Sequence, residues 1–130
     1  MTKQQAPCGT WTSPITASIV AAGATPLAAL VLDGADLYWL EGRASEAGRS
    51  TLVGTQSGKP GELTPAPFNV RSKVHEYGGG AYTVAGGVAW FSNHADSRLY
   101  RVEAGAQPVP VTAEDNKQRY ACLLYTSPSP

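Results

Sequence analysis

The sequence predicts an all-β fold, and three observations support this prediction. From residue 24 onward, short apolar runs alternate with turn residues, and the 130-residue chain contains 14 glycines and 10 prolines. Only one segment before residue 24 has the pattern of a helix. A unit of about 50 residues also recurs along the chain. Its matched pairs are Gly34 with Gly86 at an offset of 52, Trp39 with Trp90 at 51, and Thr64 with Thr112 at 48.

Each repeated unit contains four short strands, which is typical of consecutive blades of a β-propeller. We therefore expect a partial β-propeller of about two four-stranded antiparallel blades, preceded by one short amino-terminal helix. A single β-sandwich is the alternative fold. The expected divisions are an extension with the helix at 1–23, two blades and the start of the next at 24–121, and a tail at 122–130. Within this region the blades are placed at 24–66 and 80–113.

The helix is expected to run from Ser13 to Gly23. Ser13 is a suitable N-cap, Pro14 suits the first turn, and Gly23 can end the helix. A helix this short is marginally stable alone, so its apolar face should pack against other elements. That face consists of Ile15, Ile19, Val20 and Ala22.

The strands of the two blades are expected in the same order. Alternating side chains and turn residues set their limits. In the first blade they are Pro26 to Leu32, Leu37 to Glu41, Ser50 to Thr55 and Glu62 to Pro65. In the second blade they are Ala81 to Ala85, Val88 to Ser92, Arg98 to Glu103 and Val109 to Thr112.

Large apolar side chains on these strands should face the space between the blades. Two blades alone would leave broad apolar faces bare and a strand edge unpaired, so the isolated chain is expected to be marginally folded and to self-associate. The expected inward residues are Leu37, Trp39, Val88, Trp90 and Leu99.

The charge balance gives no reason to expect a nucleic-acid or membrane partner. Ten basic and ten acidic residues give a net charge of zero. No apolar stretch approaches the roughly 20 residues that span a bilayer, and the first residues do not resemble an export signal. Cys8 and Cys122 form neither a metal-ligand pair nor a disulfide framework, although one long-range bridge between them is possible, so a reducing compartment is expected.

The chain contains no recognisable catalytic device, and no residue is assigned to catalysis, to cofactor binding or to a metal. It has no Gly-x-Ser-x-Gly elbow, no His-Glu-x-x-His and no phosphate-binding loop. His75-Glu76 and His94-x-Asp96 are conceivable metal ligands, but structural hydrogen bonding is the favoured interpretation. Alternation through Arg98, Tyr100 and Arg101 indicates a solvated strand edge rather than a surface for stacking nucleic-acid bases.

The least ordinary stretch is Val74 to Gly80, which contains three consecutive glycines. Glycines permit positive φ angles and close approach of the backbone. A ligand-binding loop is one interpretation. A sharp entry into the next blade is favoured, because a strand is expected to begin directly afterwards.

Several segments together resemble the amino-terminal propeller region of the prolyl oligopeptidase family of serine peptidases, most closely its acylaminoacyl-peptidase or dipeptidyl-aminopeptidase branch. The likeness extends from about Gly9 to Ala121 and covers only the first part of the family's length. The segments are Trp11 to Thr16, Asp36 to Arg43, Phe68 to Arg71, His75 to Tyr82 and Leu99 to Arg101.

The resemblance implies a cytoplasmic hydrolase whose propeller restricts the access of peptide substrates to a separate α/β-hydrolase domain. The family's Ser, Asp and His lie in that later domain, so none is carried over to this chain. The fragment alone is therefore expected to be inactive, and no cofactor is implied. Two alternatives remain: a stand-alone, propeller-like protein-interaction module and an unrelated β-sandwich binding protein.

The residues from Cys122 to Pro130 depart from the family pattern. They resemble the translation of a sequencing adapter, and we expect them to be a non-native tail. The sequence does not indicate the peptide specificity, the oligomeric state, or a role for His75 and Glu76.

Overall fold

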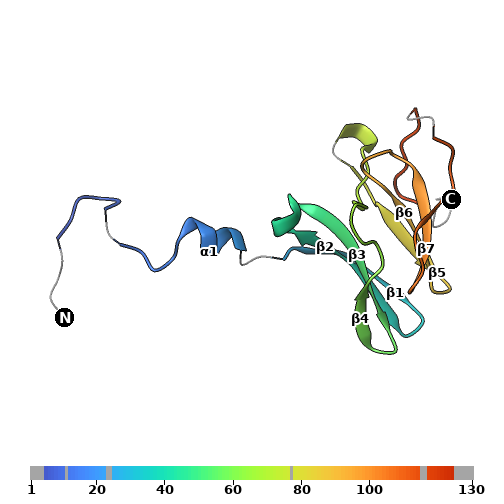
Figure 1. Ribbon diagram of the computed structural model, residues 1–130, viewed down its shortest axis with the longest axis horizontal. Helices are drawn as coiled ribbons and strands as arrows, with labels where there is room; N and C mark the ends of the chain where they lie inside the picture. The colour runs from blue at the N-terminus through green and yellow to red at the C-terminus, as the bar shows by residue number, and fades with distance from the viewer. Residues whose placement is uncertain (1–4, 11, 23–24, 77, 115–116, 125–130) are drawn as a thin grey trace, which may run out of the picture.

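The computed structural model describes residues 5–10, 12–22, 25–76, 78–114 and 117–124 (Figure 1). Within these residues the strands form two four-stranded antiparallel sheets, ordered β1-β2-β3-β4 and β5-β6-β7-β8. The two sheets are not closed into a ring, as expected for part of a propeller, and the predicted fold class is confirmed. We call the sheets blade 1 and blade 2. Their strands are β1 Leu27–Asp33, β2 Asp36–Arg43, β3 Arg49–Gln56, β4 Lys59–Glu62, β5 Tyr82–Ala85, β6 Val88–Ser92, β7 Leu99–Glu103 and β8 Val109–Pro110.

The helix is shorter than the sequence indicates. Helix α1 spans Ala17–Ala22, and Thr16 rather than Ser13 caps it, because the Thr16 hydroxyl accepts a hydrogen bond from the Ile19 amide at 3.2 Å. Ser13 instead accepts from the Ile15 amide at 3.1 Å, in a turn before the helix. Gly23 lies outside the described residues. The expected packing of the apolar face is wrong, because Ile15, Ile19 and Val20 are all exposed and α1 projects to one side of the blades (Figure 1).

Two tight hairpins define blade 1. Asp33 pairs with Asp36 across the turn that the sequence predicts. The next turn is tighter than expected: Gln56 pairs with Lys59, so β4 begins at Lys59 rather than Glu62. Ser57 and Gly58 both have positive φ angles, of 51° and 77°, which is the geometry of a two-residue hairpin turn.

The repeat is real, but the match of Trp39 to Trp90 is wrong by one residue. Asp33 pairs with Asp36 and Ala85 pairs with Val88, so the two opening hairpins correspond at an offset of 52, which holds in β1 as far back as Val31. Trp39 therefore corresponds to Phe91, and Tyr38 corresponds to Trp90. Matching the two tryptophans shifts one blade by one residue. Because side chains alternate between the two faces of a strand, this shift assigns each side chain to the wrong face.

Thr64 and Thr112 do correspond, as their hydrogen bonds demonstrate. The Thr64 hydroxyl accepts from the Leu52 amide at 2.8 Å, and the Thr112 hydroxyl accepts from the Leu99 amide at 3.1 Å. An arginine also donates to each threonine carbonyl: Arg49 to Thr64 at 2.9 Å and Arg98 to Thr112 at 2.8 Å. Both blades thus attach the chain that follows their last strand in the same way.

The core lies between the blades, and the predicted set of inward residues is wrong. Leu37, Trp39, Val88, Trp90 and Leu99 are all on the opposite, outer faces, where Leu37 is 40% exposed and the other four are only partly buried. The inward faces carry the alternate residues of the same strands. The buried core consists of Tyr38, Leu52, Leu63, Val70, Ala81, Tyr82, Val84, Ala89, Phe91, Tyr100 and Val102.

The connection between the blades passes through this core. The Phe68 ring packs edge-on against Tyr100 and Phe91, with centroid distances of 5.0 and 5.8 Å. The Val70 amide donates to the Ser50 carbonyl at 2.8 Å, and the Arg71 amide donates to the Ser92 carbonyl at 3.1 Å. The connection therefore bonds to one strand end of each blade and joins them.

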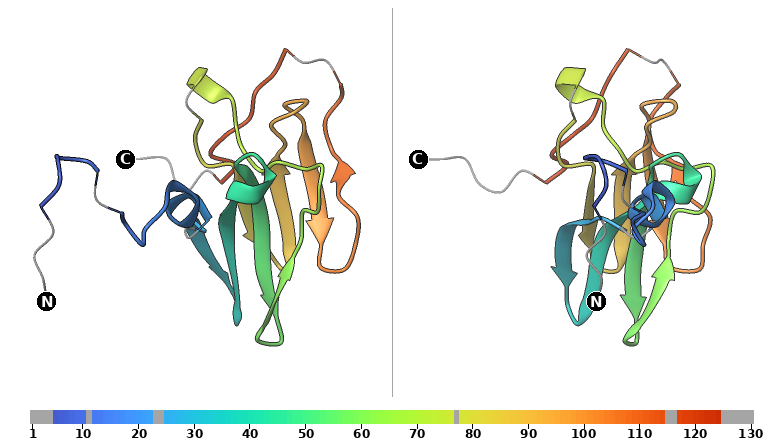
Figure 2. Two further views of the ribbon diagram at one scale, coloured as in Figure 1. Left: turned by 60° about the vertical axis from the view of Figure 1, so that its left-hand side comes forward. Right: turned by 90° about the vertical axis from the view of Figure 1, so that its left-hand side faces the viewer.

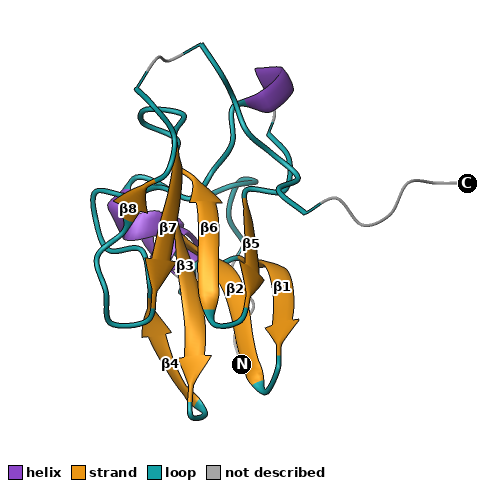
Figure 3. Cartoon of the chain, turned by 90° about the vertical axis from the view of Figure 1, so that its right-hand side faces the viewer, coloured by secondary structure: helices purple, strands orange, loops and turns teal. Residues whose placement is uncertain are grey.

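Tyr82 provides a second link between the blades. Its hydroxyl donates to the Ala29 carbonyl and lies 3.0 Å from the Tyr38 carbonyl. Burial raises the pKa of Tyr82 to about 12, which keeps this donor protonated. The first strands of the two blades, β1 and β5, consequently lie next to each other (Figure 3).

We expect Gly54→Ala to destabilise the chain, because an alanine methyl group at this position would lie 2.7 Å from ring carbons of Tyr38. Overpacking of this kind costs about 1–3 kcal/mol in the free energy of unfolding, measured by urea denaturation. Gly61, the register partner of Gly54, provides a matched control because a methyl group added there would meet no atom within 4 Å. Gly61→Ala should be neutral or stabilising by up to about 1 kcal/mol. Equal losses for the two variants would contradict the close packing of Tyr38 on Gly54.

We also expect Thr64→Val to cost more than Thr112→Val, although the two threonines make the same hydrogen bond. Thr64 is fully buried, so its loss leaves the Leu52 amide without a partner, at about 1–3 kcal/mol in the free energy of unfolding. Thr112 is only partly buried, and water can replace its hydroxyl beside the Leu99 amide. Urea denaturation of both variants measures the difference. A larger loss for Thr112→Val would contradict this assignment.

Candidate functional site

The segment from Ser72 to Gly80, here called the corner, projects from one end of the blades (Figure 2, yellow-green). It contains the short 3-10 helix η2, Val74–Glu76. His75 and Glu76 have consecutive positive φ angles of 53° and 67°, which residues other than glycine rarely adopt. The Gly78 amide donates to the Val74 carbonyl at 2.8 Å and closes the turn.

The chain's own residues near position 120 occupy the corner. Ser72 donates through Oγ to the Tyr120 carbonyl at 2.6 Å, and the Cys122 amide donates to the Gly80 carbonyl at 2.7 Å. An added methyl group at Gly79 would lie 3.0 Å from the Ala121 Cβ atom. The glycines therefore allow two segments of this chain to approach closely, which supports the structural interpretation that the sequence favours.

One exposed ion pair sets the electrostatics of the corner. Arg119 donates to Glu76, and this hydrogen bond, together with the arginine charge, lowers the pKa of the Glu76 carboxyl below its ordinary value. The charge of Lys73 acts in the same direction. The ionised form of the carboxylate is thus favoured, and it pairs with Arg119.

The residues considered as metal ligands do not converge. In the described part of the chain, no three His, Cys, Asp or Glu side chains are grouped closely enough to hold a metal ion. Asp96 instead orders a turn: its carboxylate accepts from Asn93 at 3.0 Å, from the Arg98 amide at 3.1 Å and from the Tyr100 hydroxyl at 2.6 Å. Burial, with the charges of nearby lysine and arginine, lowers the pKa of His94.

The alternation of Arg98, Tyr100 and Arg101 is explained by contacts within the chain. Arg98 donates twice to the Thr112 carbonyl. The Tyr100 ring is buried against Phe91, and burial followed by the bond to Asp96 raises the pKa of Tyr100 to about 12. Arg101 pairs with Glu103 at the surface.

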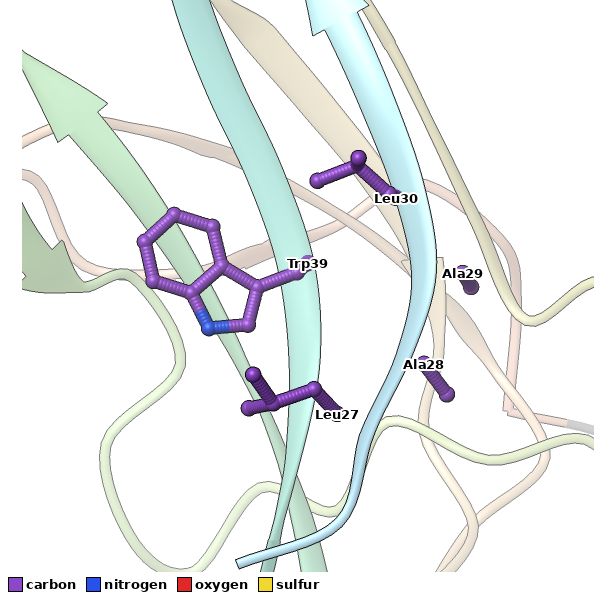
Figure 4. Close-up of a pocket in the computed structure, with 5 residues that line it drawn as sticks. All are labelled: Leu27, Ala28, Ala29, Leu30 and Trp39. Atoms are coloured by element: carbon purple, nitrogen blue, oxygen red, sulfur yellow. The ribbon is translucent and has the colours of Figure 1, made fainter.

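Sequence reasoning missed an apolar pocket of about 340 Å³ on the outer face of blade 1 (Figure 4). It exists because β1 contains a bulge: Ala28 pairs with Leu40 and Val31 pairs with Tyr38, so two residues lie opposite Trp39. The sequence signals this bulge only by the small residue at position 29. In the structure Ala29 has a φ angle of 53°. None of the residues that line the pocket is titratable, and the lining is mainly apolar. Its lining is Leu27, Ala28, Ala29, Leu30 and Trp39.

Three solved structures are similar to this chain. A puromycin-hydrolysing peptidase from Mycobacterium tuberculosis is 38% identical over 92% of this chain, with a TM-score of 0.78. A puromycin hydrolase is 35% identical over 83% of the chain, and a mutant of puromycin hydrolase complexed with PGG is 37% identical over 81%, both with a TM-score of 0.70. No family model and no curated protein matches the chain.

These neighbours are peptidases of the prolyl oligopeptidase family, so the resemblance that the sequence motifs indicate is confirmed. The chain spans only 17–19% of the length of the three peptidase chains. None of its described helices is long and apolar enough to cross a membrane.

We expect the Glu76 carboxyl to titrate below its ordinary value, and Arg119→Gln to raise its pKa toward that value. Because the folded-state pKa is lowered, the stabilisation from this pair is complete at neutral pH and is lost as pH falls through the folded pKa. A nuclear magnetic resonance titration of the side-chain carboxyl measures the shift. Arg101→Gln, which breaks a different exposed pair, is the control and should leave Glu76 unchanged. An ordinary Glu76 pKa in the unmodified chain would contradict the ion pair.

Proposed function

We propose that this chain forms the amino-terminal propeller part of a serine peptidase that hydrolyses peptides, of the aminopeptidase or oligopeptidase type. In this proposal the Ser, Asp and His of the reaction lie in a separate α/β-hydrolase domain. The observation that carries the proposal is that nearly all of this chain matches a small part of peptidase chains.

The surface chemistry of the two blades supports a role in shaping a substrate chamber rather than in catalysis. The conspicuous polar groups of the corner are engaged within the chain: Glu76 with Arg119, and Ser72 with the Tyr120 carbonyl. The proposed blades, at 24–66 and 80–113, would form part of the wall that restricts which peptides reach the catalytic domain. The proposal includes a cytoplasmic location and no cofactor.

The outer faces of the blades give further support. Leu32 and Leu37 on blade 1 and Val109 and Val111 on blade 2 are all 40% or more exposed. In a complete propeller, neighbouring blades would cover both faces. A stand-alone interaction module is the second candidate, and the same exposed faces would be its binding surfaces.

We expect purified residues 1–130 to cleave neither aminoacyl nor acylpeptide chromogenic substrates, because acyl transfer needs a nucleophile, a base and an oxyanion hole. The source gene should be resequenced beyond the codon for Ala121, and the full reading frame should be expressed. Its product should cleave these substrates, and a serine-directed organophosphate should abolish that activity.

Two results would contradict the proposal. One is turnover by residues 1–130 that the organophosphate abolishes. The other is a native reading frame without a hydrolase domain, which would favour the interaction module.

A further inference from the structure

Two basic side chains beside the corner have no acidic partner in the described part of the chain. Arg71 is the only described arginine that makes no ion pair with a described acid, because every other described arginine pairs with a glutamate. Lys73 makes no such pair either, although its charge acts on Glu76. Glu76 itself pairs with Arg119. The described residues therefore do not neutralise the positive charge at Arg71 and Lys73.

These two side chains share one face of the chain with His94. Val70 and Asn93 form an antiparallel bridge, and both are buried. Because side chains alternate along an extended chain, the next residues, Arg71 and His94, lie on the other side of this bridge. The residue between Arg71 and Lys73 is buried too, so Lys73 lies on the same side as Arg71. We call Arg71, Lys73 and His94 the basic strip.

The electrostatics of the basic strip favour an anionic partner. Burial lowers the pKa of His94, and the positive charges of Lys73 and Arg71 lower it further. Like charges that lie close together repel each other, and a nearby opposite charge offsets this cost. A guanidinium group binds a carboxylate through two parallel hydrogen bonds, and a neutral imidazole can add a hydrogen bond without adding charge. The strip therefore fits a surface that carries carboxylates.

The basic strip lies at the end of the blades where the chain enters and leaves them. Adjacent antiparallel strands run in opposite directions, so a blade of four strands begins and ends at the same end. The chain that leaves blade 2 returns to the corner, where the Cys122 amide donates to the Gly80 carbonyl at 2.7 Å. The turn between β3 and β4 lies at the opposite end (Figure 2). A domain that follows any number of such blades is therefore attached at the end that carries the strip.

We propose that the basic strip contacts aspartate or glutamate side chains of the α/β-hydrolase domain that the proposed function places after the propeller. The length of chain outside the structure supports this choice of partner, because this chain spans only 17–19% of the peptidase chains that it matches. The inference rests on the proposed function and adds to it a contact surface, with positive groups on the propeller and carboxylates on the catalytic domain.

Chemical cross-linking of the product of the full native reading frame tests this contact. A water-soluble carbodiimide joins a lysine amine to a carboxylate in ion-pair contact as an amide, and the reagent takes up the water that is released. Mass spectrometry of the digested protein should find Lys73 joined to an aspartate or glutamate of the hydrolase domain. Lys59 is the control, because it makes no ion pair with a described acid and lies at the turn between β3 and β4. It should not be joined to that domain.

A charge reversal in the same full-length product gives a second measurement. Lys73→Glu should lower the thermal midpoint, because the new carboxylate repels the carboxylates of the hydrolase domain. At about 1 M salt, where the Debye length falls to about 3 Å, most of this loss should disappear. Lys59→Glu makes the same change of charge at the opposite end of the blades and should leave the midpoint unchanged at both salt concentrations.

Several outcomes would overturn the proposal. They are the absence of a cross-link from Lys73 to the hydrolase domain, equal cross-linking of Lys59 to that domain, and a Lys73→Glu variant as stable as Lys59→Glu. If Lys73 is not cross-linked and Arg71→Gln lowers kcat/KM only for peptides with acidic side chains, the strip binds substrate and the proposal is wrong. A native reading frame without a hydrolase domain would refute the proposed function itself, so the two failures are distinguishable.

Discussion

Phe68 joins the two blades and packs against the buried core. Its carbonyl accepts a hydrogen bond from Arg49 of blade 1 at 3.0 Å, while its ring packs against Phe91 and Tyr100 of blade 2. Burial alone would lower the pKa of Arg49, but hydrogen bonds and charges from Glu46 and Glu62 raise it. The guanidinium therefore stays charged and keeps its carbonyl contacts. Among the described residues, the direct hydrogen bonds between the blades are those of the Tyr82 hydroxyl and one from the Gly87 amide to the Asp33 carboxylate at 2.7 Å.

The repeat also explains why exposed and buried surfaces have similar composition. A blade in a propeller must present an apolar surface on both sides, because each side meets a neighbour. Trp39 and Phe91 occupy equivalent positions, yet Phe91 is fully buried and Trp39 is not. Their difference in burial arises from position in the array rather than from the character of the strand.

The sequence predicts those features that local chemistry determines. Asp33-Gly34 and Gly86-Gly87 specify hairpin turns, and the structure has both. The sequence does not predict which face of each strand is buried. The tryptophans of the two blades lie at positions that differ by one residue, and because side chains alternate between faces, they lie on opposite faces of the repeated unit. Serine and threonine are both favourable N-cap residues, so the sequence does not distinguish Ser13 from Thr16. The point at which the backbone becomes helical decides between them. The glycines of the corner predict a close approach of the backbone, which the structure has at Gly79, but the partner segment near Ala121 depends on tertiary contacts.

The bulge at Ala29 accounts for both the pocket and a link between the blades. The extra residue directs the Ala29 carbonyl to the Tyr82 hydroxyl of blade 2. The same extra residue places Leu27 and Leu30 on the side of Trp39, which opens the hollow between them (Figure 4). The pocket and the inter-blade hydrogen bond thus share an origin in the bulge.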